Sequence, residues 1–311
     1  MKKEIKKLDL LIVGAGPAGL TASIYAARAK LTSMTLEDKL IGGQVKDAYE
    51  IENYPGFAKI NGVELSEKMQ EQAINLGAEI DEFDKICCMS LKDNEKYIET
   101  DKFIYKPKAV ILTTGTERIT LPVKDEKKFH GNGIHYCELC DGPMYDGKRI
   151  IVVGGGNSGV QAAIFLAKYV DKITLINNMS DLSADKKNQE NLFREEKINV
   201  IYNTTITSII GDSSLQGFKI KNLVNNEEDE IKADGAFVYI GMKPMDELFK
   251  SYIELDKFGF IKTNENMETN IKGVFAAGDI RVKRFRQITT ATGDATIAAL
   301  MAEEYIKNLG R

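Results

Sequence analysis

The sequence predicts an α/β protein built from two nucleotide-binding domains. Three observations carry this prediction. A glycine-rich loop at residues 14–19 follows an apolar run and precedes an Ala-rich stretch, and a second such loop at residues 154–159 has the same surroundings. Between the loops lies a Cys-x-x-Cys pair, Cys137 and Cys140. Strand, glycine loop and helix in that order are typical of Rossmann-like, three-layer ββα domains, and their recurrence predicts two related units.

The composition describes a globular protein of ordinary type. The chain has 311 residues, 43% of them hydrophobic and 28% charged, which is enough for two domains with separate cores. The net charge of −4 does not favour nucleic-acid binding. The apolar run at residues 8–13 is too short for a membrane span, and no signal cleavage site follows it. Four cysteines do not make a disulfide framework, so we expect a reducing cytoplasm.

The first loop has the spacing of a dinucleotide fingerprint. Residues 8–13 predict a buried parallel strand, and the helix is expected at about residues 18–29. Gly14 permits the tight turn, Gly16 lets the backbone approach a pyrophosphate, and Gly19 allows close packing of helix on strand. The N–H groups at the helix start would hold the phosphate.

An acidic residue stands where a ribose ligand is expected. A second strand is predicted over residues 33–36, and it ends at Glu37, 18 residues after Gly19. A carboxylate at this distance is placed to bind the ribose hydroxyls. Together with the loop, it predicts a dinucleotide site.

The four cysteines do not predict a metal site. A structural zinc needs four ligands, and neither the adjacent pair Cys87 and Cys88 nor the two histidines completes a zinc-binding spacing with Cys137 and Cys140. Cys87 and Cys88 lie in a strand-like stretch, residues 85–91, where we expect buried structural thiols. A redox-active dithiol is the remaining interpretation of Cys137 and Cys140.

Further short segments decide which family the chain resembles. They are Gly42-Gly43-Gln44, Glu52 to Phe57, Thr113-Thr114-Gly115, Gly273 to Asp279, and Arg286-Gln287 before a final helix that begins at residues 289–299. With the dithiol and both loops, the chain resembles the low-molecular-weight thioredoxin reductases over essentially its whole length. The resemblance implies a thioredoxin reductase-like fold, FAD as the cofactor, thioredoxin as a partner, a homodimer and a cytoplasmic location.

The resemblance also implies a domain plan and a set of FAD ligands. The FAD domain would comprise residues 1–116 and 246–311, and the inserted dithiol domain residues 117–245, with hinges at 115–118 and 241–244. The FAD ligands implied are Gly14, Gly16, Pro17, Ala18, Gly19, Glu37, Gly43, Gln44, Asn53, Thr114, Gly115, Gly278, Asp279, Arg286 and Gln287.

By the same resemblance, the residues of the dithiol motif have separate roles. Cys140 would accept electrons from the flavin, Cys137 would attack the partner's disulfide, and Asp141 would donate or accept the proton. His135 is a poorer candidate for the proton role, because the family assigns it to the aspartate. The family usually has small or hydroxyl residues between the cysteines, whereas this chain has Glu138 and Leu139. The Glu138 charge is expected to raise the pKa of the Cys137 thiol and so to alter the preference for partner proteins.

The second loop departs from the NADPH-dependent pattern. The strand that follows it runs into Asn177-Asn178, where relatives carry arginines for the 2′-phosphate, and the loop helix has Gly159, Gln161 and Ala162 in place of the usual residues. Two missing arginine contacts would cost about 3–6 kcal/mol. NADPH is therefore not expected as an efficient donor, whereas Asn177 could still hydrogen-bond a ribose of NADH.

This combination is similar to the ferredoxin-dependent flavin thioredoxin reductases of anaerobic bacteria. A ferredoxin near −400 mV and a thioredoxin near −270 mV differ by roughly 130 mV, or about 6 kcal/mol for two electrons. The basic segment 281–286 is a candidate docking surface for ferredoxin, or it serves the flavin and thioredoxin as in relatives. The charged run at residues 124–128 is expected to be a solvated loop.

Three functions therefore remain open. The leading one is a ferredoxin-dependent disulfide reductase, and the second is an NAD(P)H-dependent thioredoxin reductase with an atypical nucleotide pocket. The third is a non-catalytic flavoprotein redox sensor. The complete set of Cys137, Cys140 and Asp141 disfavours the sensor, which needs no proton donor.

Overall fold

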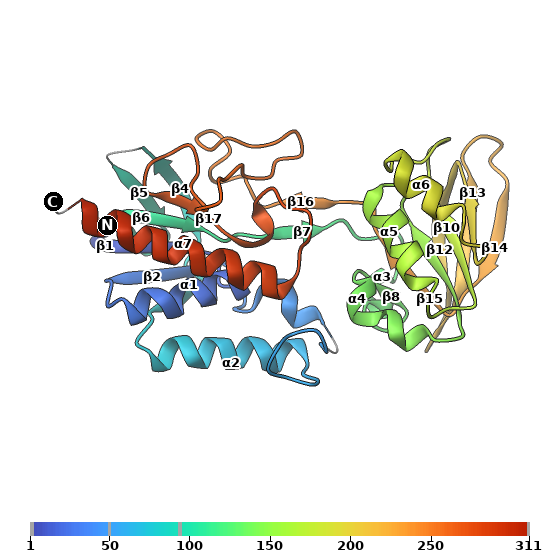
Figure 1. The fold of residues 1–311 in the computed structure, drawn as a ribbon, viewed down its shortest axis with the longest axis horizontal. Helices are drawn as coiled ribbons and strands as arrows, with labels where there is room; N and C mark the ends of the chain where they lie inside the picture. Colours follow the sequence, from blue (N-terminus) through green and yellow to red (C-terminus); the bar gives the residue numbers. More distant parts are fainter. Residues whose placement is uncertain (1–2, 49–50, 93–94, 310–311) are drawn as a thin grey trace. The chain divides into compact units, whose positions relative to one another are not determined.

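The computed structural model describes residues 3–48, 51–92 and 95–309, and the chain divides into two compact units (Figure 1). The first unit comprises Met1–Glu117 and Lys243–Arg311, and the second comprises Arg118–Met242. The chain crosses between them at β7 (Thr116–Arg118) and β16 (Met242–Pro244), which pair with each other. The two segments expected as hinges therefore contain paired strands.

The first unit is built on a seven-stranded sheet. Its order is β3 (Ile80–Glu82), β2 (Ser33–Glu37), β1 (Glu4–Val13), β6 (Phe103–Leu112), β5 (Lys96–Thr100) and β4 (Ile86–Leu91), with β17 (Val274–Ala276) also paired to β6. Strands β1, β2, β3, β6 and β17 pair in parallel, whereas β4 and β5 pair in the antiparallel direction. The carboxyl ends of β1, β2, β6 and β17 consequently meet at one edge of the sheet.

Helices cover one face of this sheet. Alternation along β1 places Leu10 and Ile12 against α1 (Pro17–Arg28) and α7 (Ile288–Asn308), and places Leu11 and Val13 in the core on the other face. Helix α2 (Gly62–Asn75) packs beside α1, and short 3-10 helices follow at η1 (Gly43–Asp47) and η3 (Gly278–Ile280). The strands and the first helix predicted from the sequence are confirmed.

The second unit has three layers. The strands of its parallel sheet run in the order β11 (Ile198–Ile201), β10 (Lys172–Ile176), β9 (Arg149–Val153), β15 (Gly235–Val238) and β8 (Ile134–His135). An antiparallel sheet contains β12 (Thr204–Gly211), β13 (Leu215–Asn222) and β14 (Glu228–Lys232), and the helices are α3 (Glu126–Phe129), α4 (Glu138–Asp141), α5 (Asn157–Leu166) and α6 (Lys186–Leu192), with η2 (Gly142–Tyr145) after α4.

The central strand of the second unit shows why the layers form. Ile150 and Val152 pack toward α5, whereas Ile151 and Val153 pack toward the antiparallel sheet. A strand that is buried on both faces reads as a continuous apolar run, as residues 149–153 do. The predicted α/β class with Rossmann-like, three-layer ββα organisation is confirmed. No helix among the described residues is long and apolar enough to cross a membrane.

Candidate functional site

The first glycine loop joins β1 to α1 in the first unit. Gly14 has a φ of +103°, and a Cβ at this position would lie 2.6 Å from the carbonyl oxygen of Thr113. A Cβ at Gly19 would lie 1.8 Å from the carbonyl oxygen of Gly14. Both positions therefore require glycine. Helix α1 begins at Pro17, and no side chain caps it at Gly16, so the N–H groups of its first turn remain for an anion.

Glu37 lies at this loop, at the end of β2. Its Oε2 accepts a hydrogen bond from the Ala15 N–H at 2.8 Å, and its Oε1 accepts one from the Lys39 N–H at 3.0 Å. Burial raises the pKa of the Glu37 carboxyl above its ordinary value. The carboxyl group is thus fixed beside the loop, which is the position that a ribose ligand requires.

Two distant glycine segments approach the same loop. A Cβ at Gly43 would lie 3.2 Å from the Cα of Gly16, and a Cβ at Gly278 would lie 3.0 Å from the Cβ of Ala18. Both glycines have positive φ. Glycine at these positions lets the two segments approach the start of α1 closely, so that backbone without side chains surrounds the loop.

The segment after β6 is held by side-chain hydrogen bonds within the first unit. Gln44 donates from Nε2 to the carbonyl and hydroxyl oxygens of Thr116, and Thr114 donates from Oγ1 to the Met245 carbonyl at 2.8 Å. Gly115 between them has a φ of +64°. These predicted FAD ligands therefore also fix the course of the chain where it leaves and re-enters the first unit.

The residues predicted near the end of the chain contact two earlier segments. Asn53 donates from Nδ2 to Oε1 of Gln287 at 3.3 Å. The guanidinium of Arg286 lies over the ring of Phe260, 4.1 Å from its centroid, and its Nε donates to the carbonyl of Asp279 at 3.3 Å. The structure thus brings these predicted residues together as two hydrogen-bonded pairs, Asn53 with Gln287 and Arg286 with Asp279.

Asp294 in α7 is a site residue that the motifs did not identify. Its Oδ2 accepts hydrogen bonds from the Gly278 N–H at 3.2 Å and from Lys283 Nζ at 2.7 Å, and its Oδ1 accepts one from Arg281 Nη1 at 2.9 Å. The residue is 9% exposed. The available signal was an acidic residue on the Ala-rich, buried face of the last helix, where a carboxylate needs partners.

The same contacts change the interpretation of the basic segment 281–286. Two of its cations pair with Asp294, and Arg286 is half-buried against an aromatic ring, so Arg284 is the exposed cation of this segment. A docking surface for an acidic partner requires several exposed charges. The packing of this segment therefore favours the second interpretation, in which it serves the flavin site.

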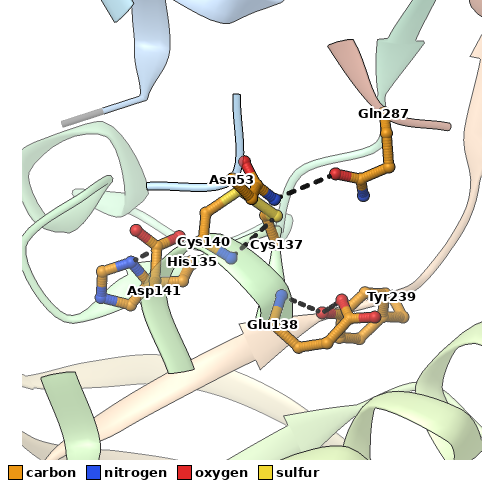
Figure 2. Close-up of a disulfide and its surroundings, with 8 residues drawn as sticks. All are labelled: Asn53, His135, Cys137, Glu138, Cys140, Asp141, Tyr239 and Gln287. Atoms are coloured by element: carbon orange, nitrogen blue, oxygen red, sulfur yellow. Dashed lines mark hydrogen bonds and ion pairs between the residues drawn. A yellow bond between two sulfur atoms is a disulfide. The ribbon is translucent and has the colours of Figure 1, made fainter. Parts of the chain in front are cut away.

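The dithiol lies at the start of α4 in the second unit, as predicted. Cys137 and Cys140 form a disulfide, and Cys137 is the N-cap residue, with its Sγ accepting a hydrogen bond from the Cys140 N–H at 3.2 Å. An N–H group directed at this sulfur stabilises a thiolate once the disulfide is reduced. Figure 2 shows the disulfide with the polar side chains of the same unit, His135, Glu138, Asp141 and Tyr239.

Asp141 and His135 face each other next to the dithiol (Figure 2). His135 Nδ1 lies 3.3 Å from Asp141 Oδ2, and His135 Nε2 lies 2.7 Å from the hydroxyl of Tyr145. His135 is 2% exposed and stacks on Phe237 with ring centroids 5.3 Å apart. The predicted proton donor, Asp141, therefore lies beside a buried imidazole, and that imidazole contacts the Tyr145 phenol.

Glu138, whose charge beside Cys137 was expected to raise the pKa of that thiol, is paired with Tyr239. The Tyr239 hydroxyl donates to the Glu138 carboxylate and accepts a hydrogen bond from the Glu138 N–H at 2.9 Å. Burial and the Glu138 charge raise the pKa of Tyr239 well above its ordinary value, so the phenol stays protonated and remains a donor. Tyr239 thus holds the first residue of α4.

We expect Tyr239→Phe to lower the free energy of unfolding by about 1.5–3 kcal/mol, because it removes the hydrogen-bond partner of both the Glu138 carboxylate and the Glu138 N–H. Denaturant unfolding of the two proteins measures the difference. Tyr97→Phe is the matched control, since it removes a phenol that donates to Glu99 at a solvent-accessible site of the first unit. Equal losses in the two variants would contradict a special role for Tyr239.

The second glycine loop repeats the geometry of the first. Gly154 has a φ of +119°, and a Cβ there would lie 2.1 Å from the Tyr239 carbonyl oxygen. A Cβ at Gly159 would lie 2.0 Å from the Gly154 carbonyl oxygen. The turn and the packing of α5 on β9 are therefore intact, and the departures from the family lie in what surrounds the loop.

Asn177 folds the segment after β10 onto the loop. It is 3% exposed, and its Nδ2 donates to the carbonyls of Met179 at 3.1 Å and Asp181 at 2.9 Å. A Cβ at Gly155 would lie 2.5 Å from Asn177 Oδ1 and 2.9 Å from a methyl carbon of Leu182. Both N–H bonds of this amide are thus committed to its own segment, so the ribose contact considered for Asn177 lacks a donor.

Residues 177–188, which we call the capping segment, also cover the start of α5. The Ser183 N–H donates to the Gly155 carbonyl at 3.0 Å. Asn157, the first residue of α5, accepts from the Asp185 N–H at 2.8 Å and from Asn188 Nδ2 at 2.7 Å, and donates to the Asp185 carboxylate at 3.1 Å. A carboxylate at this helix start opposes the binding of a pyrophosphate.

The expectation that Cys87 and Cys88 are buried was wrong, because both are exposed. They lie in β4, at the edge of the sheet, and the pairing of β4 with β5 has a register shift between Ile86 and Cys88. In a regular strand, consecutive side chains point to opposite faces, and the bulge breaks this alternation. Cys87 bonds Asp101, and this bond raises the pKa of its thiol.

The charged run at residues 124–128 is only partly the solvated loop that was expected. Glu126 begins helix α3 and is 5% exposed, and its carboxylate accepts a hydrogen bond from the Tyr136 hydroxyl at 2.7 Å. Phe129 at the end of the helix is buried. The buried ring draws this turn of chain against the core, whereas Lys124, Lys127 and Lys128 are exposed.

Comparison with known proteins agrees with this geometry. The family model for pyridine nucleotide-disulphide oxidoreductases matches residues 8–295. The chain is 53% identical over 304 residues to a 34.2 kDa protein in the rubredoxin operon of Clostridium pasteurianum, covering 98% of this chain and 99% of that protein. It is 40% identical over 309 residues to the thioredoxin reductase of Bacillus subtilis, covering 98% and 97% of the two chains.

Solved structures show the same relationship. The thioredoxin reductase of Streptococcus pyogenes has a TM-score of 0.90 and 35% identity, with 97% of this chain and 99% of that chain covered. A ferredoxin-flavin thioredoxin reductase from Clostridium acetobutylicum has a TM-score of 0.54 and 30% identity, with 98% and 100% covered. These matches confirm the predicted thioredoxin reductase-like fold with two Rossmann-like domains.

Proposed function

Because the chain belongs to the thioredoxin reductases of the pyridine nucleotide-disulphide oxidoreductase family, we propose that it is a ferredoxin-dependent disulfide reductase. In this proposal a homodimer in the cytoplasm takes electrons from reduced ferredoxin and transfers them through FAD and the Cys137–Cys140 pair to thioredoxin. Membership of the family supports the disulfide reductase chemistry, and the segment around the second glycine loop supports ferredoxin as the electron donor.

FAD is the cofactor of this family, and the first unit fits it. Gly16, Gly43 and Gly278 bring backbone without side chains to the start of α1, whose N–H groups would hold the pyrophosphate, and Glu37 is fixed for the ribose. When bound, FAD can accept single electrons and release a pair, which a one-electron donor such as ferredoxin requires. The remaining predicted ligands keep the roles assigned to them by the resemblance.

The roles proposed for the dithiol follow its place on α4. Cys140 receives electrons from the flavin side, and Cys137, whose sulfur accepts the Cys140 N–H, is the thiolate that attacks the partner's disulfide. Asp141 transfers the proton that the departing sulfur needs. The exposed side chain of Leu139 between the cysteines leaves an apolar contact for the partner protein.

The capping segment is the observation that favours ferredoxin over a pyridine nucleotide. It places a carboxylate, Asp185, at the start of α5 and uses both amide N–H bonds of Asn177 internally. Residues 177–185 therefore offer no cation to the 2′-phosphate of NADPH, and Asp185 places a negative charge near its pyrophosphate. The similarity to a clostridial ferredoxin-flavin thioredoxin reductase supports the same donor.

NAD(P)H-dependent reduction is the competing function. The intact turn at Gly154 and Gly159 favours it, and so does the 40% identity to the Bacillus subtilis thioredoxin reductase. The two donors make opposite predictions for one measurement, the loss of flavin absorbance under anaerobic conditions. The redox-sensor alternative is separated by turnover, because a sensor would not reduce thioredoxin repeatedly.

We expect reduced ferredoxin to bleach the flavin rapidly and to support thioredoxin reduction, whereas NADPH and NADH bleach it poorly. A difference of at least about tenfold in rate, or about 1.4 kcal/mol, is required. Asn177→Arg combined with Asn178→Arg should restore little NADPH use, because Asn177 holds the capping segment in place. Rapid bleaching of the wild-type flavin by micromolar NADPH would overturn the ferredoxin assignment.

A further inference from the structure

His135 lies in β8 and is buried between the dithiol helix and the aromatic core of the second unit. Its Nε2 contacts the Tyr145 hydroxyl at 2.7 Å, whereas its Nδ1 is buried and has no hydrogen-bond partner among the described residues. The atom that Nδ1 faces is Asp141 Oδ2, at 3.3 Å. A buried polar atom without a bond is costly, so a small rotation that closes this contact is favourable.

The tautomer of His135 follows from its two neighbours. Burial is the main cause that raises the pKa of Tyr145, so its phenol keeps its proton and can donate it to Nε2. Nε2 is then the acceptor, and the ring proton resides on Nδ1. An ionised Asp141 carboxylate is an acceptor only, so the Nδ1–H group is the donor in this contact.

We propose that His135 is a positioning residue that holds Asp141 for proton transfer to the leaving sulfur, with Tyr145 fixing the imidazole tautomer. This inference rests on the disulfide reductase function and does not depend on the electron donor. It adds His135 to the proposed set of Cys137, Cys140 and Asp141, because it assigns a role to the imidazole on the buried side of Asp141.

The reduction of one partner disulfide proceeds in two exchange steps. Asp141 takes the proton of the Cys137 thiol, and the Cys137 thiolate attacks the partner's disulfide, which forms a mixed disulfide and breaks the partner's S–S bond. The departing partner sulfur carries away the electron pair and takes the proton from Asp141. Cys140 then loses its proton to solvent and attacks Cys137, which releases the second partner sulfur to be protonated by solvent and restores the enzyme disulfide. Two electrons pass from the enzyme dithiol to the partner.

Other charged and titratable groups surround this pair. Asp234 acts electrostatically on Tyr145. Glu138 is the first residue of α4, in the same turn as Asp141, and it pairs with Tyr239, which follows β15. On the side of β15 the imidazole stacks on the apolar ring of Phe237. Among these groups, Tyr145 and Asp141 are the ones that contact the imidazole nitrogens.

Two amide variants separate the contacts of the imidazole. The amide nitrogen of asparagine can take the place of Nδ1, and that of glutamine the place of Nε2. We expect His135→Gln to slow thioredoxin reduction about tenfold, Tyr145→Phe about threefold, and His135→Asn less than threefold. The rate is measured by mixing anaerobic holoenzyme, reduced with dithionite, with oxidised thioredoxin. Retained flavin absorbance shows that the first unit of each variant is folded, and denaturant unfolding checks the second unit, which contains the substitutions.

The chain offers a matched control trio in the same unit. His130 lies 3.5 Å from Glu126, and Tyr136 donates to that glutamate, so a histidine, a tyrosine and a carboxylate meet at a site other than Asp141. His130→Gln and Tyr136→Phe should leave the rate within twofold of wild type. In an Asp141→Asn background, His135→Gln should cause no further loss, because its effect passes through Asp141.

A wild-type rate in His135→Gln, an equal loss in His135→Asn, or an additive loss in the Asp141→Asn background would each overturn the proposal. A wild-type holoenzyme that fails to reduce thioredoxin would instead contradict the proposed function, so the two failures are distinguishable. The test uses a chemical reductant, and its outcome is therefore independent of ferredoxin.

Discussion

Cys140→Ser is expected to lose thioredoxin reduction by at least about a thousandfold while the protein keeps its FAD. The variant removes the sulfur that receives electrons, and the FAD ligands proposed for the first unit are unchanged. Cys137→Ser should lose turnover equally, because the thiolate that remains, Cys140, is the one proposed to face the flavin and not the partner. Steady-state reduction of thioredoxin with reduced ferredoxin, together with the flavin spectrum, measures both effects.

The exposed cysteines supply the control for this experiment. Cys87→Ser with Cys88→Ser removes two thiols that lie outside the dithiol motif, and this variant should retain full activity. It also removes the background in thiol titrations, so that reduction of Cys137–Cys140 can be counted directly. If either dithiol variant kept more than about a tenth of the wild-type rate, a barrier change of less than ~1.4 kcal/mol, the assigned roles would be wrong.

Asp294→Ala should lower the free energy of unfolding by about 3–5 kcal/mol and weaken FAD retention. The substitution leaves Arg281 and Lys283, whose side chains are 15% and 8% exposed, without their shared carboxylate, and removes the acceptor of the Gly278 N–H. Removing one partner of a buried charge pair has a cost of this size. Denaturant unfolding and the flavin content after gel filtration measure the two effects.

A control for Asp294 lies on the same helix. Glu303→Gln breaks the pair with Lys307, one turn apart on the exposed side of α7, and should change the free energy of unfolding by less than about 0.5 kcal/mol. A similar small effect for Asp294→Ala would mean that Arg281 and Lys283 find water or other partners. The proposed support of Gly278 by α7 would then be wrong.

The predictions that succeeded depended on local patterns. Residues 8–13, 149–153 and 172–176 are apolar runs that end at a turn, and a buried parallel strand is their expected structure. The glycine spacing fixed the start of α1, and the Cys-x-x-Cys motif fixed the start of α4. In each case the neighbours along the chain determine the structure, so a single sequence contains the necessary information.

The features that the sequence did not reveal depend on pairing between distant segments. The exposure of Cys87 and Cys88 comes from a bulge against β5, which no local pattern in β4 reveals. Glu138 pairs with Tyr239, about a hundred residues away. Asp294 pairs with Arg281 and Lys283, which precede α7. A charged residue next to a functional motif predicts a strong interaction, but the identity of its partner requires the tertiary structure.

The geometry of the second glycine loop limits what a glycine motif reveals about a ligand. Gly154 and Gly159 have no room for a Cβ because the chain's own carbonyl groups fill the space, and Gly155 is restricted by Asn177 and Leu182. These glycines are therefore required for folding whether or not the loop binds a nucleotide. The glycine motif of the second unit identifies how the chain turns, and the residues after the following strand determine what a nucleotide would meet there.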